Sequence, residues 1–214
     1  MHTIKQKDLH DCCTIESMDC ETTGQLKNVL WIVFALNLGM FFIEFYFGID
    51  ARSSSLLADS LDMFADAFVY GLSLFVLTQN HYRQASASMF KGITMMALGF
   101  FVLTENLSKM VYPVIPDGMT ISAVGLLALA VNILCVVLLL KFKDKTLNVK
   151  SAWLCSRNDA FGNVVVIVAG LLVSTFSSQL PDILIGFVLS FVVLKSSIQI
   201  IVSSRRELIY HKYH

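Results

Sequence analysis

Six long apolar segments dominate the sequence, and short polar stretches separate them. Each segment has roughly the 20 residues that an α-helix needs to cross the hydrocarbon core of a bilayer. We therefore expect an all-α membrane protein, a bundle of six transmembrane helices. The expected spans are Val29–Gly48, Leu56–Leu77, Met89–Val111, Met119–Leu140, Ala152–Phe176 and Ile183–Val202. They divide the chain into a polar N-terminal tail (1–27), a six-span transmembrane domain (28–204) and a short C-terminal tail (205–214).

The composition agrees with a membrane protein of one domain. Of the 214 residues, 56% are hydrophobic and only 15% are charged, a balance more apolar than a soluble core of this size requires. The net charge is zero, and no basic, aromatic-interleaved patch indicates nucleic-acid binding. The first 27 residues lack the apolar core of a signal peptide. The five cysteines are an odd number, so we expect reduced thiols rather than a disulfide framework.

Lysine and arginine residues are distributed unevenly between the two ends of the expected spans. With the N-terminus in the cytosol, twelve of the 16 basic residues fall in inner segments, and only Arg52 and Lys109 fall in outer loops. Because inner loops are enriched in these residues, the bias predicts that both termini are cytosolic. Arg157 and Lys195 lie within spans, and we expect Arg157 to extend toward the inner headgroups. We expect a multi-pass integral protein of a bacterial inner (plasma) membrane.

Three aspartates interrupt the second apolar segment. Asp59, Asp62 and Asp66 are spaced by three and four residues, so they fall on one stripe of a helix. A carboxylate near the middle of a span costs roughly 2.5–3.5 kcal/mol, which water, protons, a partner cation or a metal must offset. Two inward carboxylates at i and i+4 supply half of a divalent-cation cage. The competing interpretations are a soluble helix with an acidic start and, for Asp59 alone, a capping or dipole role.

The fifth segment carries a second set of polar residues. Cys155, Asp159 and Asn163 recur every four residues and therefore share one helix face. At 1.5 Å of rise per residue, Asp62 and Asp66 lie roughly 11 and 17 Å below the outer surface, and Asp159 lies roughly 14 Å above the inner surface. In a core about 30 Å thick, the two sets can meet near the midplane if the helices are antiparallel.

These two segments resemble the cation diffusion facilitator family of divalent-metal/proton antiporters. Residues Ser54–Asp66 follow that family's second-span pattern, S-L-A-L-L-A-D-A-x-[HD]-x-x-x-D, closely. The fifth-span pattern has a His or Asp four residues before an Asp, then a small or amide residue, and Cys155, Asp159 and Asn163 meet it. The resemblance extends over all six spans and includes Glu44, Gly48, Gly125, Asn132, Gly162, Pro181 and Asp182.

The resemblance implies a six-helix bundle whose second and fifth spans hold one divalent metal in a tetrahedral site. Carried over by position, the metal ligands are Asp62, Asp66, Cys155 and Asp159. The family exports zinc, cadmium, cobalt, iron or manganese, usually as a homodimer, by alternating access coupled to proton entry. We therefore expect metal ions, protons and the lipid bilayer as partners, no cofactor, and no enzymatic activity.

Three departures from the family pattern bear on this expectation. Cys155 stands where a His or Asp is usual; a thiolate among carboxylates favours zinc or cadmium, whereas a small buried side chain is the alternative. The stretch Lys141–Lys150 has no histidine that would capture metal. The sequence after the last span has no counterpart of the family's cytosolic domain, so we expect a short form.

Other polar residues receive secondary roles. Asp59, Asn163 and Glu44 are candidates for a second shell around the metal or for a proton relay, although Glu44 can also simply pack against neighbours. Glu105 and Lys109, at i and i+4, are expected to form an ordinary ion pair. The N-terminal tail offers possible ligands for soft metals, or only incidental thiols, at His10, Cys12, Cys13 and Cys20.

Metal and protons are expected to compete for the same carboxylates, with Asp66 and Asp159 carrying most of both functions. Two other classes of function remain open. One is a membrane-embedded metal scaffold or sensor that binds without transport. The other is an intramembrane enzyme that uses the aspartates to activate water.

Overall fold

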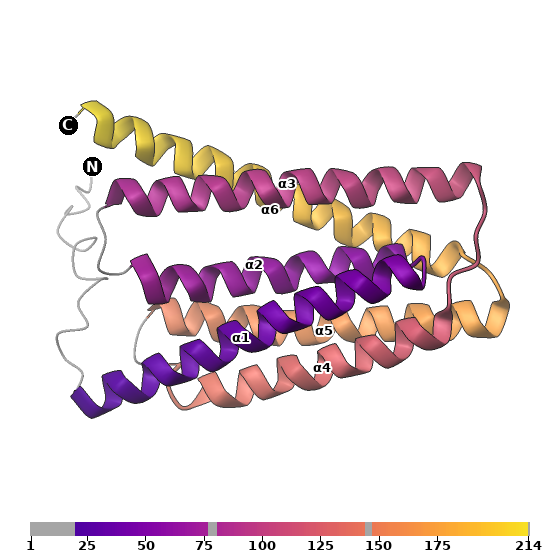
Figure 1. Ribbon diagram of the computed structural model, residues 1–214, viewed down its shortest axis with the longest axis horizontal. Coiled ribbons are helices and arrows are strands. Elements are labelled where there is room, and N and C mark those ends of the chain that lie inside the picture. Colours follow the sequence, from indigo (N-terminus) through magenta and orange to yellow (C-terminus); the bar gives the residue numbers. More distant parts are fainter. Residues whose placement is uncertain (1–19, 77–80, 144–146, 214) are drawn as a thin grey trace, which may run out of the picture.

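A computed structural model describes residues 20–76, 81–143 and 147–213, which form six α-helices and no strand (Figure 1). The expected all-α, six-helix architecture is confirmed. In chain order the helices are α1 Cys20–Asp50, α2 Ser54–Val76, α3 His81–Val111, α4 Gly118–Leu140, α5 Leu147–Phe176 and α6 Leu180–Tyr213. The start of α1 and the end of α6 lie at the same end of the bundle.

Helices α1 and α6 continue into residues that the sequence assigned to polar tails. Helix α1 begins nine residues before the expected span, and α6 runs to Tyr213 instead of ending near residue 202. Polarity ends an apolar membrane span but does not end a helix, because chain extension requires only the absence of a breaker such as proline. The two helices therefore extend beyond the expected hydrocarbon core.

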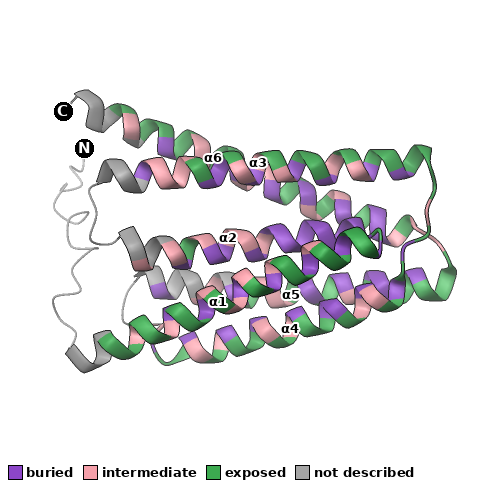
Figure 2. Ribbon diagram, in the orientation of Figure 1, coloured by how far each residue is buried: buried purple, intermediate pink, exposed green. Residues whose placement is uncertain are grey.

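Five helices in the described part of the chain are long and apolar enough to cross a bilayer. Helix α2 is the exception, because every 18-residue stretch of it contains Asp59, Asp62 and Asp66. It packs against α1, α3, α5 and α6. Figure 2 shows that its burial is most continuous in the half next to the α1–α2 turn. The protein is thus a multi-pass integral membrane protein that encloses its most acidic helix.

Glycines allow helices α4 and α5 to approach backbone to backbone. A Cβ atom on Gly118 would lie 2.4 Å from the carbonyl oxygen of Gly170, and one on Gly170 would lie 2.7 Å from the oxygen of Gly118. Such distances are too short for any side chain, so both positions require glycine. This contact holds α5, the helix that carries Asp159, against α4.

A buried carboxylate clamps the start of α2 to α6. Asp182 is 0% exposed. Its Oδ1 accepts hydrogen bonds from Ser53 Oγ (2.6 Å), Ser55 Oγ (2.6 Å) and Ser55 N (3.0 Å), and its Oδ2 accepts one from Ser54 N (2.8 Å). The free N–H groups of a helix start favour an anion there. Asp182 therefore caps α2 from another helix.

Lys109 completes this clamp from α3. Its Nζ lies 3.9 Å from Asp182 Oδ2 and donates to Arg52 O (2.7 Å) and Ser54 Oγ (2.6 Å). The close ion pair is therefore with Asp182, whereas Glu105, the expected partner, acts on the ammonium group only at longer range. Helix spacing predicts contacts along one helix, whereas a buried lysine binds the acceptors that tertiary packing brings to it.

Candidate functional site

The three aspartates of α2 lie inside the bundle. Asp59 and Asp66 are buried, and Asp62 is half-buried. Asp62 interacts electrostatically with both of the others, as their spacing of three and four residues predicts. These interactions are all repulsive when the groups are ionised, so α2 concentrates negative charge along one stripe.

Helix α5 contributes the fourth carboxyl group. Asp159 is half-buried and interacts most strongly with Asp66, then with Asp62. Its Oδ2 accepts no hydrogen bond from any group in the described part of the chain. The structure thus brings Asp62, Asp66 and Asp159 together across the contact between α2 and α5.

These carboxyl groups do not form a complete metal shell by themselves. Within residues 20–76, 81–143 and 147–213, no three His, Cys, Asp or Glu side chains converge closely enough to hold an ion. The backbone of Cys155 belongs to α5, but its side chain lies outside the described part, as does that of Cys20. His10, Cys12 and Cys13 also lie outside the described residues, so the N-terminal metal capture remains a prediction.

Two residues near the aspartates were missed by sequence reasoning. Tyr70 is buried; its hydroxyl donates to Asp66 Oδ2 at 3.2 Å and lies 2.9 Å from Ser156 Oγ on α5. The spacing of four residues between Asp66 and Tyr70 was the available signal. Tyr70 thus joins α2 to α5 beside the candidate site.

Lys91 is the second residue that the sequence did not reveal. It was counted among the inner-surface cations, but the structure places it buried within α3. Its charge acts on both Asp62 and Asp66, and its Nζ lies 5.9 Å from the centre of the Phe68 ring. A cation tethered next to the carboxyl groups offsets part of their charge.

The candidates for secondary roles, Glu44, Asp59 and Asn163, are all buried. Glu44 on α1 interacts most strongly with Asp59, and more weakly with Asp62 and Asp159. A Cβ atom on Gly162 would lie 3.7 Å from Asp59 Oδ1, so the glycine of α5 faces Asp59. A second carboxyl pair therefore lies next to the first set.

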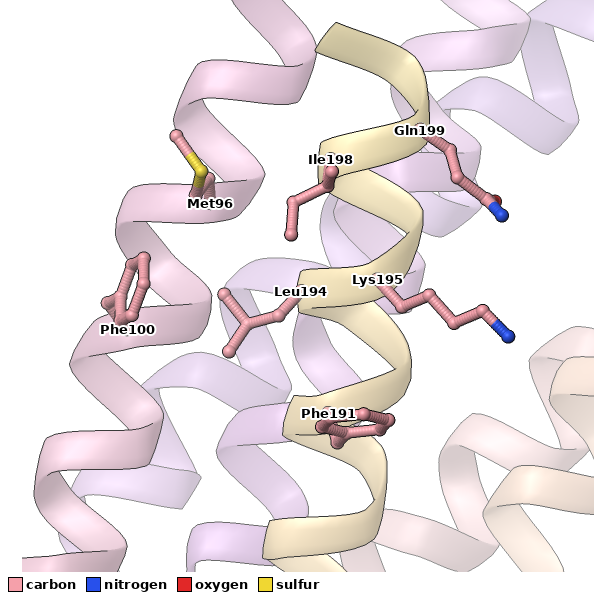
Figure 3. Close-up of a pocket in the computed structure, with 7 residues that line it drawn as sticks. All are labelled: Met96, Phe100, Phe191, Leu194, Lys195, Ile198 and Gln199. Atoms are coloured by element: carbon pink, nitrogen blue, oxygen red, sulfur yellow. The ribbon is translucent and has the colours of Figure 1, made fainter. Parts of the chain in front are cut away.

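Three grooves lined by described residues of α3 and α6 do not include the aspartates. A groove of about 390 Å³ runs between α3 and α6 (Figure 3). Its lining consists of apolar side chains with one lysine and one amide: Met96, Phe100, Phe191, Leu194, Lys195, Ile198 and Gln199. Exposed phenylalanines on a membrane helix are typical of a lipid-facing surface, so this groove does not identify the functional site.

A six-helix membrane bundle that encloses carboxyl groups from two helices belongs to the class of polytopic membrane transporters, in which intramembrane ionisable residues mark ion pathways. The sequence model of the cation efflux transmembrane domain matches residues 30–209. The chain therefore belongs to this family, the cation diffusion facilitators, and its function is divalent-cation efflux. No curated protein sequence matches the chain.

Proposed function

We propose that the protein exports a divalent metal ion, zinc or cadmium before cobalt, iron or manganese, as a metal/proton antiporter. The observation that supports this most is the electrostatic interaction of Asp62 and Asp66 on α2 with Asp159 on α5. Carboxyl groups from two helices inside a membrane bundle need a cation or protons to neutralise them. Both are supplied by an exchange of metal for protons.

The proposed ligands are Asp62, Asp66, Cys155 and Asp159. Three carboxylates and one thiolate match a four-coordinate ion, and the thiolate favours zinc or cadmium over magnesium or calcium. Cys155 precedes Asp159 by one helical turn and therefore falls on the same face of α5. The metal is the transported substrate, and the proposal includes no cofactor and no enzymatic reaction.

The exchange follows from the chemistry of the carboxyl groups. A divalent ion requires the aspartates in their ionised form, and the crowded carboxylates repel one another once the ion has left. Protons from the outer side then neutralise them, and loss of these protons to the cytosol restores metal binding. Between metal release and proton binding, Lys91 offsets part of the negative charge, and the hydrogen bond from Tyr70 holds Asp66 in place.

We further propose that alternating access exposes the site first to the cytosol, at the end where α1 begins and α6 ends. The support is the burial of all of Ser53–Leu61, which closes the opposite end, together with the distribution of basic residues. A bacterial inner membrane and a homodimer are the expected setting. Light scattering of the purified protein in detergent tests the dimer.

A flux assay in liposomes tests the proposal. The protein is reconstituted into liposomes, and zinc, cadmium, cobalt, iron or manganese is added on one side of the membrane under an imposed proton gradient. We expect metal flux coupled to proton movement in the opposite direction, fastest for zinc or cadmium. Metal binding without flux would replace the proposal with the scaffold or sensor interpretation.

Substitutions of Cys155 test the ligand set separately. Cys155→Ser and Cys155→Asp remove the soft ligand, so preference is expected to move from zinc or cadmium toward manganese. Unchanged preference in both variants would show that Cys155 is a small packed side chain instead of a ligand.

A further inference from the structure

Glu44 is the buried acid with the least compensation in the described part of the chain. Its side chain is 0% exposed, and apart from the neighbouring carboxyl group of Asp59, no described group donates a hydrogen bond to it. All the charged groups that act on it are acidic: Asp59, Asp62 and Asp159. A buried carboxyl group without a donor or a cation is rare in folded proteins and indicates a missing ion or water.

Asp59 shares this environment. Its Oδ2 also lacks a hydrogen-bond partner among the described groups, and its carboxyl lies beside that of Glu44. Asp62 and Asp66 differ, because the buried ammonium group of Lys91 acts on them. The positive charge of Lys91 therefore acts on Asp62 and Asp66, whereas the described charged groups that act on Glu44 and Asp59 are acidic.

Helix α5 carries a further buried side chain with an oxygen donor. Asn163 is 0% exposed, and neither of its side-chain polar atoms has a partner in the described residues. It follows Gly162, which faces Asp59 Oδ1, and it lies one turn after Asp159 on the same helix face. The absence of a side chain at Gly162 leaves room next to Asp59.

We infer that Glu44 and Asp59, assisted by Asn163, form a second binding position for a divalent cation. This inference rests on the proposed function, in which the first position contains Asp62, Asp66 and Asp159. The new position has only oxygen donors, which suit harder cations such as manganese and lack the thiolate expected at the first position.

Its place in the fold gives the second position a role in transport. Asp59 precedes Asp62 by about one helical turn, roughly 4.5 Å along the axis, on the side of the α1–α2 turn. An ion that leaves the first position toward this end meets Glu44 and Asp59 next. A weaker, all-oxygen position there gives the ion an intermediate stop on its way out, from which it dissociates more easily than from the thiolate.

Manganese binding to variants of the full chain in nanodiscs tests this inference. Mn²⁺ is the probe because the cysteines and histidines of the N-terminal tail prefer softer ions, and free Mn²⁺ is measured by electron paramagnetic resonance. The double variant Asp66→Asn/Asp159→Asn removes the first position, and we expect it to retain one Mn²⁺ per chain. Adding Glu44→Gln is expected to weaken this binding more than tenfold, since even indirect ligand partners contribute 10–100-fold.

The controls separate this result from a loss of fold. Asn106→Ala changes another buried side chain without a described partner, in α3, and should leave Mn²⁺ binding unchanged. Asp59→Asn should reproduce the loss if Glu44→Gln reduces the helical circular dichroism signal.

Each outcome decides the matter. No Mn²⁺ bound to the double variant, or binding that is insensitive to both Glu44→Gln and Asp59→Asn, overturns the inference and leaves the proposed function intact. Binding that depends on Glu44 in a protein whose wild type shows no metal flux supports the second position and overturns the proposed function.

Discussion

The carboxylate of Asp182 is expected to be a major source of stability, because it joins α2, α3 and α6 at one buried point. The substitution Asp182→Asn keeps the shape of the side chain and one acceptor oxygen. Its amide group, however, then faces the N–H of Ser54 and the ammonium group of Lys109, which are both donors. One hydrogen bond and the ion pair are lost, and the buried ammonium group of Lys109 loses its nearest counter-charge.

The magnitude follows from these contacts. Removing one partner of a buried ion pair costs about 3–5 kcal/mol, because the remaining charge is uncompensated. We therefore expect Asp182→Asn to lower the free energy of unfolding by about 3–5 kcal/mol. Lys109→Met leaves the Asp182 carboxylate with four hydrogen bonds and should cost less. The loss of unfolding free energy in the double variant should be smaller than the sum of the losses in the two single variants by about 1–3 kcal/mol.

Unfolding of the purified protein by sodium dodecyl sulfate, followed by circular dichroism, measures these differences. Asp50→Asn is the matched control, since this aspartate is exposed at the end of α1 near the same turn. A loss below about 1 kcal/mol for Asp182→Asn, or additive effects in the double variant, would refute the reasoning.

Three further predictions concern the site, the helix contact and a loop. Lys91→Met removes a positive charge beside the aspartates and should tighten zinc binding at pH 8 by about tenfold, an effect of roughly 1.4 kcal/mol, as titration calorimetry can measure; weaker binding would contradict it. Gly170→Ala places a Cβ atom 2.5 Å from a side-chain oxygen of α4 and should destabilise the fold by about 1–3 kcal/mol. Gly39→Ala, with no atom within 4 Å, is its control and should not destabilise. Asp117 caps α4, and the bond from the Thr120 hydroxyl holds the pKa of its carboxyl below the usual value. Because the folded-state pKa is lowered, this stabilisation is present above about pH 4 and is lost as the pH falls through the folded-state pKa. Asp117→Ala should therefore cost about 1 kcal/mol at neutral pH and progressively less in acid, when unfolding is measured at both.

Most of the features that the sequence predicted correctly follow from the periodicity of a helix. Apolar length predicted six helices, and spacing of three and four residues placed Asp62 and Asp66 on one face of α2. The same spacing put Asp159 on the face of α5 that meets Asp66 in the structure. These features are local, and a local pattern is readable in one segment without knowledge of the others.

The contacts between distant segments were not readable in this way. Asp182 binds serines nearly 130 residues earlier, and the carboxylate nearest to Lys109 is that of Asp182, not that of its helical neighbour Glu105. In the sequence, Lys91 was interpreted as a cation that faces the headgroups. A lysine looks the same in the sequence whether it lies at the membrane surface or beside buried aspartates. Only the packing of α2 among four other helices determines which of these environments each side chain enters.

The central claim, that carboxyl groups from α2 and α5 bind one transported ion, is tested most directly by zinc flux in liposomes. Wild type, Asp66→Asn, Asp159→Asn and the exposed control Asp50→Asn are compared at equal protein density. We predict that Asp66→Asn and Asp159→Asn each reduce zinc flux by more than about 100-fold, a larger effect than the loss of an indirect ligand partner causes. Asp50→Asn should keep the flux of the wild type. Flux close to that of wild type in Asp159→Asn would contradict the account.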